Sequence, residues 1–126
     1  MLRDSLADLH THVAARAAGG GRGALWGFFD YYREHVEELS LGLYLYNGIG
    51  PTGLDAALDR DLNRRLRQVV DLIEQAYAQD GVPDAESHTA GGIAQAIGLL
   101  VMETTGRLRL FEGDAESLFE AYLDRA

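Results

Sequence analysis

A long run rich in small and apolar residues, from Ser87 to Leu110, constrains the fold of this chain more than any other feature. Helical spacing places one stripe on Ile93, Ile97, Leu100 and Leu108 and a second stripe on Gly91, Gly98, Val101 and Thr105. A helix with two packing faces needs two partners. In a short chain one of those partners is often a second copy of the same protein, because a two-fold interface lets one patch complement itself.

Apolar residues recur with helical spacing along most of the chain, and no segment shows the alternation that is typical of a strand. The pattern predicts an all-α fold, an antiparallel bundle of about five helices. We expect them near residues 2–13, 25–46, 52–77, 84–110 and 114–123. We expect a single domain, in which residues 1–18 form a connecting helix, residues 19–23 a glycine-rich linker and residues 24–126 the bundle.

The composition excludes several classes of protein. The 126 residues suffice for one domain, with 47% hydrophobic and 25% charged residues. Twenty acidic residues against eleven basic ones give a net charge of −9, which disfavours direct binding to nucleic acid. The chain has no cysteine, and we find neither a signal peptide nor an apolar run of about 20 residues that would span a membrane. We therefore expect a cytoplasmic protein.

Three short motifs suggest chemistry, and each has a simpler explanation. Residues 48–53 match G-x-G-x-x-G, but no pair of strands accompanies them, so we interpret them as a helix connection. Glu34, His35, Glu37 and Glu38 lie close together, but a solvated charged face explains them better than a carboxylate metal site. No serine has a histidine and an acid placed beside it by local spacing. We predict no enzyme activity, no cofactor and no metal.

The helix expected at 25–46 is unusually aromatic. It carries seven of the eleven aromatic residues of the chain, which are Trp26, Phe28, Phe29, Tyr31, Tyr32, Tyr44 and Tyr46. One interpretation is an ordinary core; the other is a ring-lined cavity that admits an organic ligand. Gly98 and Met102 suit either interpretation, since glycine opens space and methionine adapts to varied shapes.

The order of these features resembles the C-terminal domain of TetR-family transcriptional regulators. The resemblance rests on three stretches: Trp26-Gly-Phe-Phe-Asp-Tyr-Tyr-Arg-Glu-His35, Ile93-Ala-Gln-Ala-Ile-Gly98-Leu-Leu-Val-Met102, and Leu118-Phe119-x-x-Tyr122-Leu123. It covers nearly the whole chain. The resemblance implies an all-helical domain that binds an effector and dimerises, with the last two helices pairing with their two-fold mates as a four-helix bundle.

The family pattern also implies which residues act. A small hydrophobic or aromatic effector would lie among Trp26, Phe29, Tyr32, Val70, Gly98 and Met102. The homodimer interface would include Ile93, Ile97, Leu100, Val101, Leu108, Leu118, Phe119 and Tyr122, on helices expected at 89–110 and 115–123. In the family a helix-turn-helix domain precedes this one, so DNA contact is expected only through a helix-turn-helix that this chain does not contain.

Two other hypotheses stay open from the residues alone. The chain could be a structural or protein-interaction bundle with a filled core and no ligand. It could also be a carboxylate metal-binding bundle, for which Glu38 would be the residue to test.

Overall fold

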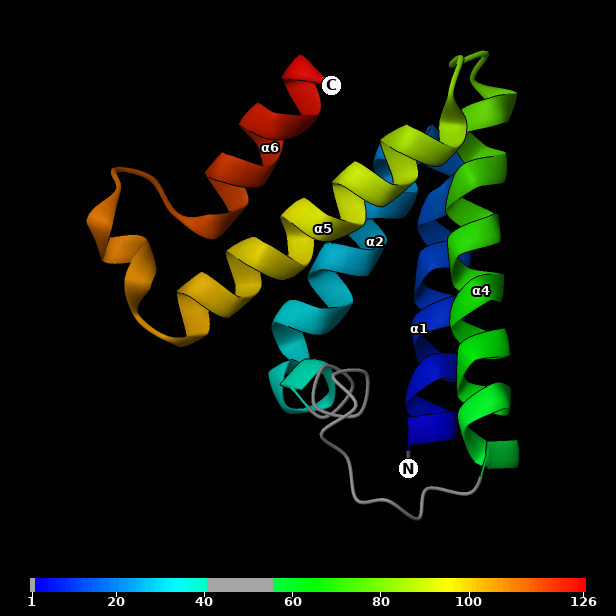
Figure 1. Cartoon of the computed structure of the whole chain (residues 1–126). Helices are drawn as coiled ribbons and strands as arrows, with labels where there is room; N and C mark the ends of the chain where they lie inside the picture. Colours follow the sequence, from blue (N-terminus) through cyan, green and yellow to red (C-terminus); the bar gives the residue numbers. More distant parts are fainter. Residues whose placement is uncertain (1, 41–55) are drawn as a thin grey trace.

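A computed structural model describes residues 2–40 and 56–126, and every regular element within these ranges is a helix (Figure 1). The all-α prediction is therefore confirmed. The α-helices are α1 (Leu2–Arg16), α2 (Gly20–Glu34), α4 (Ala56–Gln79), α5 (Ala85–Thr104) and α6 (Ala115–Arg125). Residues 36–40 are also helical, and short 3-10 helices occupy Ala17–Gly19 (η1) and Arg107–Leu110 (η2).

Helices α1, α2 and α4 pack side by side, and α5 crosses them (Figure 1). The buried core joins Leu9 and Val13 of α1, Leu25 of α2 and Ile73 of α4, all with no exposed surface. Burial of such side chains is the main favourable term in folding. Helix α6 folds back after η2 and packs against α5, with Phe119 fully buried.

The predicted glycine linker at 19–23 is wrong for most of its length. Gly20 turns the chain with a φ of +80°, and Gly21 already lies in the first turn of α2. Its amide donates to Asp80 Oδ2 at 2.9 Å, which satisfies one of the free donors at the helix start. A Cβ at Gly21 would lie 2.3 Å from the Tyr77 ring. The glycines therefore permit close helix packing rather than flexibility.

The predicted helix over 84–110 ends earlier than expected, at Thr104. Gly106 has a φ of +75° and so supplies the left-handed residue that commonly closes a helix. The hydroxyls of Thr104 and Thr105 bond to carbonyls of the preceding turn, which favours the end at this point. Leu108 consequently lies in η2 and does not extend the stripe of α5.

Local capping explains the start of α6. Asp114 begins α6 with a reciprocal capping box: its carboxylate accepts from the Ser117 amide at 2.8 Å, while the Ser117 hydroxyl accepts from the Asp114 amide. The helix expected at 25–46 is interrupted at His35, which leaves the helical region of the backbone. The G-x-G-x-x-G motif at 48–53, Tyr44, Tyr46 and the expected start of the helix at 52–77 lie outside the described residues.

Candidate functional site

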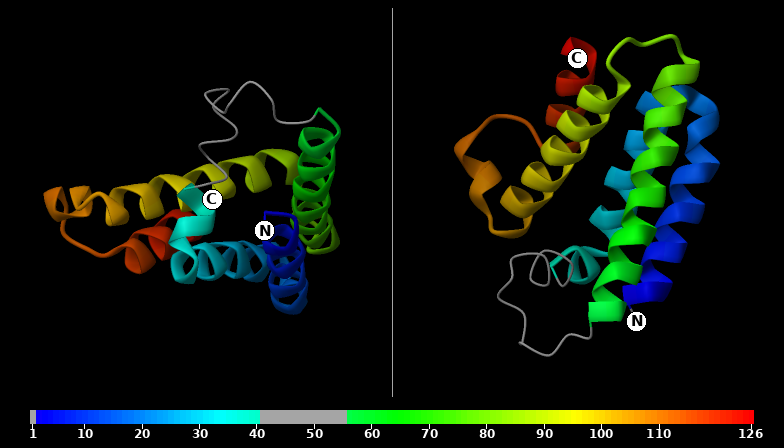
Figure 2. Two further views of the ribbon diagram at one scale, coloured as in Figure 1. Left: turned by 90° about the horizontal axis from the view of Figure 1, so that it is seen from below. Right: turned by 45° about the vertical axis from the view of Figure 1, so that its right-hand side comes forward.

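The outer face of α5 is an apolar helix face that the described residues leave uncovered. In the left view of Figure 2, α2 and α6 run along one side of α5 and no described helix covers the opposite side. Ala90, Ala94, Gly98 and Val101 are exposed there, and a Cβ at Gly98 would have no neighbour within 4 Å. A helix that is apolar on every side is normally covered on every side. This face therefore qualifies as a contact surface.

Large exposed apolar side chains concentrate near the C-terminal end of α5. Among the described residues they are Val101, Leu110 and Phe111, with 39%, 78% and 57% of their surface exposed. An open hollow of about 530 Å³ adjoins them and is lined by Glu103, Gly106, Leu108, Arg109, Phe111, Gly113 and Asp114. Apolar patches of this kind typically mark interaction sites.

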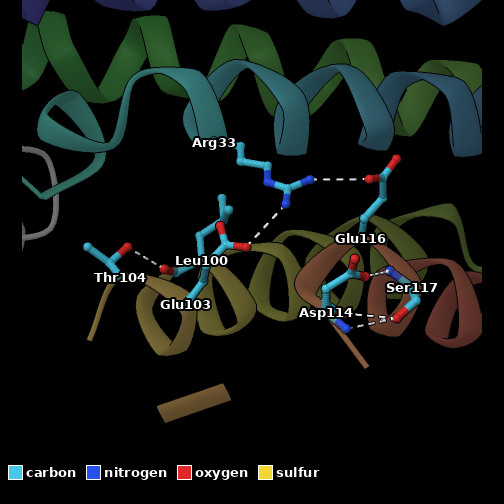
Figure 3. A network of polar contacts seen from close by, with 7 residues as sticks. All are labelled: Arg33, Leu100, Glu103, Thr104, Asp114, Glu116 and Ser117. Carbon is cyan, nitrogen blue, oxygen red and sulfur yellow. Dashed lines mark hydrogen bonds and ion pairs between the residues drawn. The ribbon is translucent and has the colours of Figure 1, made fainter. Parts of the chain in front are cut away.

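Arg33 of α2 forms ion pairs with two other helices near the C-terminal end of α5. Its guanidinium pairs with Glu103 of α5 at 3.2 Å and with Glu116 of α6 at 3.3 Å (Figure 3). It also lies over the Phe29 ring, 5.9 Å from the centroid. The two carboxylates raise the pKa of Arg33, so the side chain is charged at every ordinary pH. One residue thus joins α2, α5 and α6.

The residues expected to line an effector cavity have different neighbours among the described residues. Trp26 and Phe29 contact Phe119 of α6, with ring centroids 4.9 and 4.7 Å apart, and Phe29 and Phe119 are stacked. Tyr32 instead contacts the rings of Phe28 and Tyr31. Gly98 points away from the core, whereas Val70 and Met102 are half-buried. Each aromatic residue of α2 is therefore packed against at least one other aromatic ring.

The residues expected at a dimer interface divide into two groups. Leu100 and Phe119 have no exposed surface and belong to the core of a single chain. Val101 is exposed; the remainder are half-buried, namely Ile93, Ile97, Leu108, Leu118 and Tyr122. Leu100 and Phe119 are apolar residues with helical spacing, and periodicity alone does not tell which side of a helix faces its own chain.

A polar cluster around Tyr31 was missed by the sequence analysis. The ring of His35 stacks on Tyr31 with centroids 4.2 Å apart, and His12 approaches the same ring from α1 at 5.9 Å. Burial raises the pKa of Tyr31 to about 12, and the neighbouring Glu38 carboxylate adds to the shift. The charged residues around Glu38 predict a solvated face. The structure instead buries its Oε2 atom, so that expectation is wrong for Glu38.

No ordinary sequence signal identifies this cluster, because its members come from separate elements. Among the residues that the structure describes, no group of three or more histidine, aspartate or glutamate side chains is placed to hold a metal ion. Within the same part of the chain, no helix combines the length and the apolar character that crossing a membrane requires.

Comparison of this chain with protein-family models, with curated proteins and with solved structures gave no match. The likeness to TetR-family regulators is therefore a sequence resemblance alone, and the described residues define the class only as an all-helical bundle that leaves one face of α5 exposed.

Proposed function

We propose that this chain is the dimerisation and effector-binding domain of a TetR-like transcriptional regulator, in which two copies associate through α5. The observation that carries the proposal is the outer face of α5, where Ala94, Gly98 and Val101 stand uncovered. Covering such a face removes apolar surface from water, at roughly 25 cal/mol per Å². A second copy supplies the same face and so provides a self-complementary cover.

The burial of individual side chains limits which residues can belong to the proposed interface. Leu100 and Phe119 are fully buried within a single chain, so neither is free to contact a second copy. The proposed interface therefore uses the outer side of α5, which carries Val101 in its C-terminal half. Tyr122 of α6 is half-buried, and a Cβ at Gly91 would lie 2.5 Å from the Tyr122 hydroxyl oxygen. Gly91 and Gly98 lie on the same stripe of α5, two turns apart, so α6 approaches this stripe at Gly91 and leaves it open to a second copy from Gly98 onward.

Size analysis by sedimentation equilibrium tests self-association over a range of concentrations. We expect a dimer that Val101→Glu weakens strongly, because the new carboxylate would be buried without a partner. Ala78→Glu on α4 is the control, since Ala78 is also an exposed apolar residue but lies on another helix. A wild-type chain that stays monomeric at every concentration contradicts the proposal.

The effector half of the proposal rests on the family resemblance. Trp26, Phe29 and Phe119 offer an apolar, aromatic lining, so the expected effector is a small hydrophobic or aromatic molecule. Because Phe29 and Phe119 are stacked, an effector bound among these rings has to separate them.

Native mass spectrometry, repeated under denaturing conditions, would detect a small molecule that copurifies with the folded chain. The chain has a single tryptophan, Trp26, whose fluorescence reports directly on the ring cluster. A binding molecule should change that emission and raise the melting temperature, because it binds the folded state alone. Absence of both effects across a set of hydrophobic compounds argues against an effector site here.

A structural or protein-interaction bundle is the second candidate. The packing of Trp26, Phe29 and Phe119 favours it, since a filled ring cluster needs no ligand. This candidate predicts that no small molecule shifts the melting temperature, while a protein partner or a second copy still covers α5.

A further inference from the structure

A further hollow lies between α1 and α4, away from the one beside Phe111. The two helices run side by side in both Figure 1 and Figure 2. The hollow, here named the α1–α4 groove, measures about 250 Å³. Its volume lies below the range of about 300–1,000 Å³ that holds drug-sized molecules, so it suits a small ligand. It is lined by Leu6, Ala7, His10 and Thr11 of α1 and by Arg65 and Gln68 of α4.

Three polar side chains bring hydrogen-bond donors to the α1–α4 groove from both helices. The Nε atom of Arg65 donates to Asp61 Oδ2 at 3.1 Å, and within the described ranges neither terminal nitrogen of Arg65 has a further partner. In the same part of the chain, His10 and Gln68 make no hydrogen bond through their side chains. The Thr11 hydroxyl donates at 3.1 Å to a carbonyl of its own helix, so it is not counted with them. Arg65, His10 and Gln68 therefore offer unused N–H groups to one space.

The charges beside the groove favour an anion. Two guanidinium groups, those of Arg64 and Arg65, share the single carboxylate of Asp61. Only 15% of the Asp61 side chain and 29% of the Arg65 side chain are exposed, so solvent and salt screen this contact less than a surface pair. No aspartate or glutamate is among the described residues that line the groove. In a chain with a net charge of −9, this is a local positive site.

We infer that the α1–α4 groove binds the phosphate group of a small molecule through Arg65, His10 and Gln68. A planar guanidinium grips two oxygens of a phosphate or a carboxylate at once. A carboxylate spends both of its oxygens on that contact, whereas a phosphate group keeps a third oxygen for His10 or Gln68. The groove shares no residue with the outer face of α5 or with the ring cluster, so this inference does not depend on the function proposed above.

Phosphorus NMR tests the inference with methyl phosphate and, separately, with inorganic phosphate, at an ionic strength held constant with sodium chloride. Broadening of the phosphorus signal on addition of the chain measures binding. Arg65→Gln should raise the Kd by at least about tenfold, because it removes charge-assisted hydrogen bonds. Gln68→Met keeps the pair of Arg65 and Asp61 and should raise the Kd by about threefold.

Arg67→Gln is the matched control for the loss of charge. Arg67 lies on the same helix and pairs with Asp71 at 2.8 Å and with Glu74 at 3.2 Å, but it does not line the groove. The Kd should therefore be the same for Arg67→Gln as for the wild-type chain. Circular dichroism verifies that each variant keeps its helices.

Weakened binding in Arg65→Gln and Gln68→Met, with Arg67→Gln unchanged, supports the inference, and the tighter of the two probes identifies an ester or the free ion as the source of the phosphate group. An equal loss in Arg67→Gln overturns it in favour of general charge attraction. Acetate that displaces either probe as well as phosphate does overturns the assignment to phosphate. Absence of broadening overturns the site itself. Should Arg65→Gln not fold, Gln68→Met decides alone, and unchanged binding in that variant overturns the inference.

Discussion

Two glycines on α5 provide opposite tests of which side of the helix is covered. A Cβ at Gly98 meets no atom within 4 Å, whereas a Cβ at Gly92 would lie 2.3 Å from Cδ1 of the fully buried Leu25. Alanine in place of an interior helical glycine stabilises a helix by about 1 kcal/mol. Gly98→Ala should gain this in full, which corresponds to a rise in melting temperature of about 4 °C.

Gly92→Ala gains the same helix propensity but must displace Leu25. Overpacking of this kind typically costs about 1–3 kcal/mol, so we expect a net loss of about 1 kcal/mol. Urea unfolding followed by circular dichroism measures both variants, at a protein concentration low enough that self-association does not contribute. A destabilised Gly98→Ala chain under these conditions would refute the reasoning, because it would mean that part of the same chain covers Gly98.

Three further predictions concern single side chains. The pKa of Tyr31 in the folded chain, about 12, lies above its value in the unfolded chain. The contribution of Tyr31 to the free energy of unfolding is therefore complete below about pH 10, and up to about 2 kcal/mol of it is lost as the pH rises through 12. Tyr31→Phe should remove this decline at alkaline pH. The hydrogen bond from the Ser117 amide lowers the pKa of Asp114. The Asp114 cap of α6 therefore stabilises the fold fully above the ordinary carboxyl pKa and less as the pH falls below about 4. Asp114→Asn keeps an acceptor oxygen, and its denaturation curves should lack this contribution to the loss of stability in acid. Phe119→Ala should lower the free energy of unfolding of the monomer, measured in urea, by about 3–5 kcal/mol, because the ring is fully buried. A small decrease in that free energy together with loss of the dimer would instead indicate that Phe119 belongs to the interface.

Most of the helices follow from the spacing of apolar residues. Leu6, Leu9 and Val13 recur at helical intervals and are indeed buried, and the cap at Asp114 was readable because its chemistry is local. The end of α5 at Thr104 was harder to predict. Two β-branched threonines and a glycine are weak signals beside the apolar Leu108 and Leu110, which continue the apparent stripe for another turn.

The candidate site was less predictable than the fold, because it depends on which of two apolar faces turns inward. The stripe containing Leu100 is largely the inner one, and the Gly98 stripe is largely the outer one, but composition does not distinguish them. The cluster of His12, Tyr31 and Glu38 depends on contacts between residues that are far apart in sequence. Such contacts follow from tertiary packing, which helical periodicity does not encode.

The contact between Gly21 and Tyr77 has a mechanical consequence. A bare glycine against an aromatic ring, with the Asp80 carboxylate holding the same amide region, fixes the start of α2 to the end of α4. The turn between α1 and α2 is therefore held in place by its contacts with the end of α4. Helix α1 is joined to α2 by the ion pair of Arg16 and Asp30, at 3.0 Å, so we expect α1, α2 and α4 to behave as one rigid unit at this end of the bundle.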